Sequence, residues 1–299
     1  MKKLYWIIGL ILVFFAGDRL GGWLLGQLAG QSQFRYSRLY QQKAQSDILL
    51  LGNSRGLIFY QPYIEELTGQ STFNFSYNGL PIDLGQVLLA DYLDRYENPD
   101  ILLIDVSMCD RINNQLVSGF NLYSPHSQRL DQLIVDSIPT VAYAGRLSHL
   151  FRYNGEVFQR ALYYLGKSDE YWLNEREMNE HLVQTVAQSD SLRFHLPGNT
   201  LGALSSTVRI AKKKGLTVRL LVNPYYSPYA ERFIDFDRWL QNIELATGMK
   251  VYDYSQAIKD VKAFSDYQHL NQYGARLYID LLKKDGLLEV ENPTMLGCR

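Results

Sequence analysis

The segment DILLLGNSRG at residues 47–56 places four consecutive large apolar side chains directly before glycine, asparagine and serine. A short apolar run without polar alternation is typical of a strand that is buried on both faces, as in parallel sheets. We therefore expect a buried strand over Ile48–Leu51 that ends at Gly52. A helix should follow, because neighbouring parallel strands are joined by crossover connections.

The alternation of predicted strands and helices continues on the C-terminal side of this segment. Further strands are predicted over residues 71–76, 101–106, 216–222 and 250–253, and helices over 82–93, 199–214, 232–247 and 271–284. Gly215 and Gly286 stand where helix C-caps are expected. Repeated strand–helix units predict an α/β fold, a doubly wound, flavodoxin-like parallel sheet with helices on both faces.

The alternation is interrupted between residues 111 and 197, where polar and aromatic helical segments such as 157–165 and 171–186 take over. We interpret this region as a helical insertion in an α/β domain that covers residues 31–299. An insertion after the end of a strand would stand beside the crevice where α/β folds bind ligands. The alternative is a helical buttress that does not contact substrate.

The N-terminus carries a membrane-targeting signal over residues 1–30. Lys2 and Lys3 precede an uncharged run at residues 4–17, which at about 1.5 Å per residue spans ~21 Å of a roughly 30 Å hydrocarbon core. The apolar pattern resumes after Asp18 and Arg19, so a tilted helix could use part of it, with Trp23 at the interface. A cleaved signal peptide is the alternative. Because no convincing cleavage site follows the apolar centre, we expect an uncleaved anchor with a cytoplasmic N-terminus.

Composition excludes several classes of function. Thirty Lys and Arg against 31 Asp and Glu give a net charge of −1, which argues against nucleic acid as a partner. Cys109 and Cys298 form no metal-binding spacing, and the five histidines show none, so no metal is expected. The basic run at 212–214 suits a helix C-terminus, with phosphate or lipid-headgroup binding as the alternative.

Three sites with chemical potential fall at strand or helix ends. Ser54 follows the first strand, where its hydroxyl would be exposed at the rim of the sheet and nearby backbone N–H groups could face an oxyanion. Asp266 and His269 precede the last helix, and a serine nucleophile needs such a base, oriented by a carboxylate. Asn78 and Gly79 follow the second strand, where glycine permits close approach of a backbone N–H to a ligand. Each motif alone fits an ordinary turn.

In combination, the order of these motifs resembles the SGNH (GDSL-like) superfamily of hydrolases and acyltransferases. ILLLGNSRG resembles its first block, NFSYNGLP its second and SDYQHLNQYG its last. The resemblance covers residues 47–110 and 199–285 and implies Ser54 as nucleophile, His269 as base and Asp266 as its partner. It also implies an oxyanion hole from Ser54 and Gly79, with Asn78 as a further donor.

Two positions depart from the superfamily pattern. Asn53 replaces the usual aspartate beside the nucleophile, a change also familiar in membrane-anchored relatives. The third block usually supplies an oxyanion-binding asparagine, and here Cys109 stands near that position, so Asn78, Asn113 or a residue of the insertion would have to replace it. Candidate substrate-binding residues beside the site are Asn53, Arg55, Tyr225 and Tyr226.

The resemblance implies a single-pass, membrane-anchored, extracytoplasmic (periplasmic or outer-face) serine esterase or O-acyltransferase, for which no cofactor is needed. Anchored relatives act in O-acetylation or deacetylation of cell-surface polysaccharide. The expected partners are therefore an acylated glycan substrate, the membrane and a multi-spanning acyltransferase. The alternative function is a non-catalytic, glycan-binding or assembly subunit with the same fold, which the cysteine in the third block favours.

Overall fold

The computed structural model describes residues 2–167 and 173–290 of the chain. Its contacts divide the chain into two compact units. We call the first, Met1–Ala44 with Asn113–Glu170, the helical unit, and the second, Gln45–Ile112 with Tyr171–Arg299, the α/β unit. The region interpreted as one insertion is thus shared: residues 113–167 belong to the helical unit, and residues 173–197 belong to the α/β unit.

The α/β unit is built on a five-stranded sheet in which every pairing is parallel, in the order β2-β1-β3-β4-β5. Reversal of the winding direction beside β1 is the feature that defines a doubly wound sheet. The strands are β1 (Ile48–Leu51), β2 (Thr72–Asn74), β3 (Ile101–Asp105), β4 (Thr217–Val222) and β5 (Val251–Asp253).

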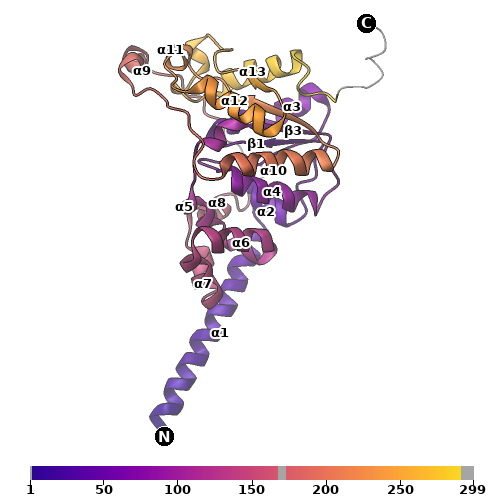
Figure 1. Ribbon diagram of the computed structural model, residues 1–299. Helices are drawn as coiled ribbons and strands as arrows, with labels where there is room; N and C mark the ends of the chain where they lie inside the picture. Colours follow the sequence, from indigo (N-terminus) through magenta and orange to yellow (C-terminus); the bar gives the residue numbers. More distant parts are fainter. Residues whose placement is uncertain (1, 168–172, 291–299) are drawn as a thin grey trace. The chain divides into compact units, whose positions relative to one another are not determined.

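Helices cover both faces of this sheet, as the alternating side chains of β1 require. Ile48 and Leu50 belong to a core that includes Ile64 of α3 and Ile279 of α13, whereas Leu51 on the opposite face packs against α4. Figure 1 shows α3 and α13 on one side of the strands and α4 and α10 on the other. The helices are α3 (Gln61–Thr68), α4 (Ile82–Leu93), α9 (Glu180–Thr185), α10 (Thr200–Lys213), α11 (Ser227–Ala230), α12 (Phe236–Thr247) and α13 (Gln272–Lys284).

The carboxyl ends of β1, β2 and β3 lie along one edge of the sheet because of their register, in which Leu50 pairs with Asn74 and with Leu103. At this edge Gly56 packs directly on the side chain of Ser76. A Cβ on Gly56 would lie 2.9 Å from the Ser76 Cβ and nearer still to its Oγ. Glycine is therefore required here by close packing, which holds the turns after β1 and β2 together.

The helical unit contains the N-terminal helix α1, which is long and apolar enough to cross a membrane over Lys3–Gly30. A signal sequence would pass the same test. The C-terminal half of α1 contacts α2, α8 and the 3-10 helix η4. The elements are α1 (Lys2–Gly30), α2 (Arg35–Tyr40), α5 (Asn114–Gly119), η3 (Phe120–His126), α6 (Gln128–Ser137), α7 (Pro139–Leu147), η4 (Leu150–Tyr153) and α8 (Glu156–Tyr163).

All the predicted strands are present, and their bounds are shorter than or equal to the predicted ones. The helix predicted over 232–247 begins only at Phe236. The helix predicted over 171–186 is wrong for most of its described length: residues 173–179 are not helical, and α9 covers only Glu180–Thr185. The backbone N–H of Met178 instead donates to the Phe264 carbonyl at 2.7 Å, and tertiary hydrogen bonds of this kind override local helix propensity.

The contact between Gly56 and Ser76 yields the first prediction. Gly56→Ala should destabilise the full-length chain by roughly 1–3 kcal/mol, because the added methyl group overlaps the Ser76 side chain. The double variant Gly56→Ala/Ser76→Gly removes the overlapping atoms and should regain part of that free energy of unfolding. Urea unfolding in detergent, followed by tryptophan fluorescence, measures both values. Equal stability of Gly56→Ala and the unaltered chain would contradict the packing.

Candidate active site

Ser54 begins the 3-10 helix η1 (Ser54–Ile58) immediately after β1, and Asn53 fixes this turn from two sides. The Asn53 Oδ1 accepts a hydrogen bond from the Arg55 backbone N–H at 3.0 Å. Its Nδ2 donates to the Ser107 Oγ at 3.1 Å, just beyond the end of β3. The serine is thus carried on a capped turn that is bound to the neighbouring strand, and this limits its freedom to move.

His269 and Asp266 lie on a short loop, residues 265–269, that is closed by an antiparallel bridge between Phe264 and Leu270. Within it the Ser265 N–H donates to the His269 carbonyl at 2.9 Å. The Asp266 Oδ1 accepts from the backbone N–H groups of Gln268 at 2.7 Å and His269 at 2.9 Å. Such a turn folds an aspartate back over the residues that follow it. Local backbone bonding thereby brings the carboxylate to the imidazole.

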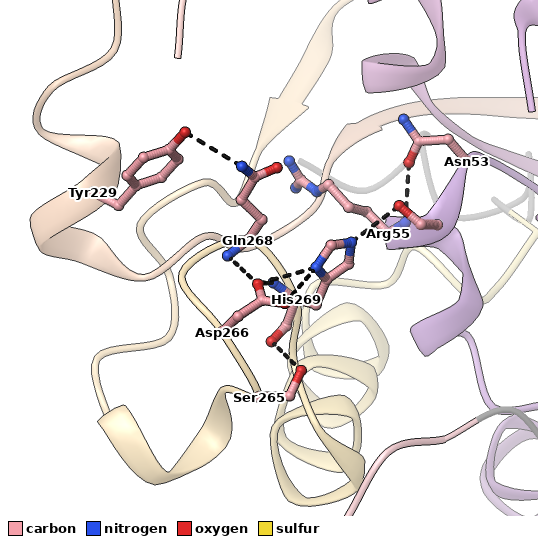
Figure 2. A network of polar contacts seen from close by, with 8 residues as sticks. Asn53, Arg55, Tyr229, Ser265, Asp266, Gln268 and His269 are labelled. Atoms are coloured by element: carbon pink, nitrogen blue, oxygen red, sulfur yellow. Dashed lines mark hydrogen bonds and ion pairs between the residues drawn. The ribbon is translucent and has the colours of Figure 1, made fainter. Parts of the chain in front are cut away.

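Three side chains form a continuous hydrogen-bonded chain. The Ser54 Oγ lies 3.0 Å from the His269 Nε2. The His269 Nδ1 lies 3.0 Å from both carboxylate oxygens of Asp266, and Figure 2 shows the imidazole facing that carboxylate. These are ordinary hydrogen-bond distances. The proximity expected between residues 54 and 269, which are 215 positions apart, is therefore observed.

The carboxylate determines which imidazole nitrogen carries the proton. Burial alone would raise the pKa of Asp266, but the hydrogen bond and charge of His269 and the two backbone N–H groups outweigh it, and the pKa lies below its ordinary value. An ionised carboxylate only accepts hydrogen bonds, so the neutral imidazole must hold its proton on Nδ1. The Nε2 lone pair then faces the Ser54 hydroxyl, as a general base requires.

Beneath the serine turn lies a buried polar network that joins this turn to the segment after β4 and to α13. The Arg55 guanidinium donates to the Asn223 carbonyl and stacks on the Tyr225 ring with its Cζ 3.3 Å from the centroid. The Asn223 Nδ2 donates back to the Arg55 carbonyl at 3.2 Å, and the Tyr278 hydroxyl donates to the Asn223 Oδ1 at 2.8 Å. All of these side chains are buried, so they support the turn from below.

The charge of this network depends on Arg55 and Asp105. Burial lowers the pKa of Arg55 to about 10, and the Asp105 carboxylate counteracts part of that shift, so the guanidinium stays charged at neutral pH. Burial likewise raises the pKa of Asp105, and Arg55 opposes the rise. The Nε and Nη1 of Arg55 and the Oδ2 of Asp105 are enclosed without a hydrogen-bond partner in the described residues. Arg55 and Asp105 therefore interact through the low dielectric of the interior without a direct hydrogen bond.

A cavity of ≈ 210 Å³ opens over Ser54 and His269. Its walls are partly apolar and partly polar, and they are formed by Ser54, Leu57, Ile58, Asn78, Leu173, Asn174, Ser265, Asp266, His269 and Leu270. This volume is below the range of typical drug-sized ligand sites. Among residues 2–167 and 173–290, no cluster of three His, Cys, Asp or Glu side chains is placed to hold a metal ion.

The structure separates the predicted site residues into two groups. Ser54, Asp266, His269 and Asn78 line the cavity, and Gly79, next to it with φ +68°, does not. The candidate substrate-binding residues also stand apart from the cavity wall: Asn53, Arg55 and Tyr225 are buried, and Tyr226 packs on the ring of Phe264. Their contacts are those of packing and support, and their role toward substrate stays a prediction.

Asn78, Asn113 or an unspecified residue of the insertion is expected to replace the asparagine of the third block as an oxyanion donor. Cys109 is a fully buried free thiol whose pKa is raised by burial, and it does not line the cavity. Asn113 caps α5 by accepting from the Leu116 N–H. Asn174, from the region read as an insertion, does line the cavity together with Leu173. No local sequence signal marks these two residues, since only the tertiary fold brings them there.

Comparison with known proteins adds no family to this description. The chain matches no protein-family model, and a search of curated proteins finds no relative. A function has to be inferred from the chemistry of the site itself.

The electrostatic interaction between Arg55 and Asp105 beneath the serine turn yields the second prediction. Arg55→Met leaves the buried Asp105 without its opposite charge and should cost about 3–5 kcal/mol of unfolding free energy. The double variant Arg55→Met/Asp105→Asn removes both charges and should be more stable than the sum of the two single losses predicts. The measurement is a double-mutant cycle from urea unfolding of the full-length chain. Strict additivity of the two substitutions would show that the residues do not interact.

Proposed function

We propose that this chain is a membrane-anchored serine esterase or O-acyltransferase that works through an acyl-Ser54 intermediate. The observation that carries the proposal is the chain of hydrogen bonds from the Ser54 Oγ through His269 to Asp266, which opens into a small cavity. A nucleophile, a base within hydrogen-bond reach and a carboxylate that orients the base are the parts that acyl transfer to serine needs.

In the first step the Ser54 Oγ attacks the carbonyl carbon of an ester while the His269 Nε2 takes the hydroxyl proton. The tetrahedral intermediate then collapses, the bond to the leaving alcohol breaks, and the imidazolium returns the proton to that alcohol. In the second step water or an acceptor hydroxyl repeats the sequence and releases Ser54. Asp266 holds the imidazole in the required tautomer and stabilises its positive charge in both steps.

The oxyanion of the tetrahedral intermediate needs donors near Ser54. The Ser54 backbone N–H is the first of η1, and it has no acceptor among the described residues, as is usual at a helix start. Asn78 and Asn174 both line the cavity and both carry amide donors. We assign them the role that an asparagine in the third block fills in the SGNH superfamily, with Gly79 as the residue that shapes the turn beside Asn78.

The class of substrate follows from the size of the cavity and from the resemblance of the motifs. About 210 Å³, with apolar walls from Leu57, Ile58 and Leu270, accommodates an acetyl group better than a long acyl chain. Anchored proteins with these motifs act on O-acetyl groups of cell-surface polysaccharide, so an acetylated glycan outside the cytoplasm is the proposed substrate. A multi-spanning acyltransferase is the proposed partner, because an acetyl donor has to reach that side of the membrane.

A second candidate function is a non-catalytic glycan-binding or assembly subunit. The buried thiol of Cys109 favours it, since the donor expected from the third block is missing. The two functions differ in one property: only the enzyme needs a nucleophilic Ser54. A probe that reacts with activated serine therefore separates them.

The third prediction is that a fluorophosphonate probe labels the full-length protein at Ser54. His269→Ala and Asp266→Asn should slow labelling by about 10²–10⁴-fold, because the hydroxyl loses its base or the base its tautomer. Peptide mass spectrometry identifies the labelled serine, and Ser205→Ala, at a serine of α10 that does not line the cavity, is the matched control. Folded protein that is not labelled at Ser54 would favour the binding subunit.

The fourth prediction concerns the oxyanion donors. Asn78→Ala and Asn174→Ala should each lower kcat for hydrolysis of p-nitrophenyl acetate by about 10²–10³-fold, the usual effect of losing one oxyanion donor. KM should change little, because the interaction forms only in the transition state. Asn179→Ala, at a residue that caps α9 and does not line the cavity, serves as control. Wild-type rates for both cavity variants would contradict the prediction and show that neither side chain stabilises the oxyanion, which would leave that role to the Ser54 backbone N–H.

A further inference from the structure

A second cavity, of ≈ 480 Å³, lies within the helical unit between the C-terminal half of α1 and the segment that contains η4. Fourteen described residues line it, and none of them is Asp or Glu. Five are basic or titratable nitrogen groups, namely Arg19, Lys43, His126, His149 and Arg152. A concave site with this imbalance favours an anionic ligand.

The cavity is built by close packing of residues 149–153 on the glycine face of α1. A Cβ on Gly22 would lie 3.1 Å from the His149 carbonyl carbon and closer to its Cβ, and one on Gly26 would lie 2.8 Å from the Tyr153 hydroxyl. Asp18 adds polar contacts: it accepts from the backbone N–H groups of His149 at 2.8 Å and Leu150 at 3.1 Å, and from the Ser148 hydroxyl. The glycine face of α1 is therefore occupied from within the chain.

Arg152 is the group in this cavity whose charge is least satisfied. Its Nε is enclosed without a hydrogen-bond acceptor, and its guanidinium forms no ion pair with any described residue. Burial lowers the pKa of Arg152, and the nearby Arg19 lowers it further. The two acids that act on it are engaged elsewhere, Asp131 with Arg146 at 2.6 Å and Asp18 with Arg19 at 3.1 Å. A half-buried cation without a counter-charge is costly, and an anionic ligand would remove that cost.

The position of the cavity along α1 matches a membrane surface. Lys3 and Arg19 are sixteen residues apart, which is ~24 Å of helix, close to the roughly 30 Å thickness of the hydrocarbon core. With Lys3 at one surface, Arg19 and the mouth of the cavity stand at the headgroup level of the other. Trp23, which lines the cavity and is 59% exposed, is a side chain typical of that level.

We infer that this cavity binds a phosphate group, supplied by the headgroup of an anionic membrane lipid, with Arg152 as its main ligand and Arg19 and Lys43 beside it. Guanidinium and phosphate form paired, charge-assisted hydrogen bonds, and the Arg152 guanidinium lines the cavity without an ion pair to any described residue. The inference rests on α1 being the membrane anchor of the proposed function, and it is independent of catalysis at Ser54.

Native mass spectrometry of the full-length protein in detergent tests this. We expect adducts of dioleoylphosphatidylglycerol on the unaltered protein, and few of dioleoylphosphatidylcholine, whose trimethylammonium group meets the basic walls. Arg152→Gln should weaken phosphatidylglycerol binding about tenfold or more, the effect of losing one charge-assisted contact. Arg152→Lys keeps the charge and should bind more tightly than the glutamine variant. Lys213→Gln loses the same charge on exposed α10 and should bind like the unaltered protein.

Inorganic phosphate distinguishes the two sources of the ligand. If millimolar inorganic phosphate displaces phosphatidylglycerol from the unaltered protein, and this effect is lost in Arg152→Gln, the site is assigned to soluble phosphate. If only another anionic lipid displaces phosphatidylglycerol, the site is assigned to a lipid headgroup. Equal phosphatidylglycerol binding by Arg152→Gln and the unaltered protein overturns the inference. Release of the protein from membranes by alkaline carbonate overturns the lipid source, while fluorophosphonate labelling of Ser54 reports separately on the proposed catalysis.

Discussion

Parallel pairing of β1 between β2 and β3 is the constraint on which the α/β unit depends. A strand whose four side chains are all buried must be covered on both faces, and the helices that provide this cover return each chain segment to the same starting edge. The loop that follows each strand therefore begins at the opposite edge of the sheet, where the carboxyl ends of the strands lie. The turns after β1, β2 and β3 meet there because of this geometry, and the close packing of Gly56 on Ser76 follows from it.

The candidate site uses two different means to place its groups. Ser54 is held from below by buried side chains whose hydrogen bonds are strengthened by the low dielectric of the interior, and Arg55 carries its charge into that interior. His269 and Asp266 are held by backbone hydrogen bonds within a short closed loop and stay half-exposed. For the proposed function, a rigidly held Ser54 opposite a half-exposed His269 would let a second acceptor enter after the first alcohol leaves.

In the helical unit, two charged residues lie within the apolar helix α1 and need partners. The polar residues Asp18 and Arg19 interrupt an otherwise apolar helix, and the structure satisfies them with the backbone of residues 147–150. Glycine on the adjoining face of α1 lets the same segment approach closely. An interruption that looks unfavourable for a membrane span is thus the point at which the rest of the helical unit attaches, and the basic cavity lies beside it.

Local patterns in the sequence determined the strands, most of the helices of the α/β unit and the α/β class, because burial on both faces and helical periodicity leave clear signals in the chain itself. They also marked Ser54, Asp266 and His269, since each falls at a strand end or just before a helix. Only the tertiary structure decided that Asn174 reaches the cavity, that Arg55 and Tyr225 are buried beneath it, and that residues 173–179 are not helical. The physical reason is that these outcomes depend on contacts between residues far apart in the chain, which no local periodicity encodes.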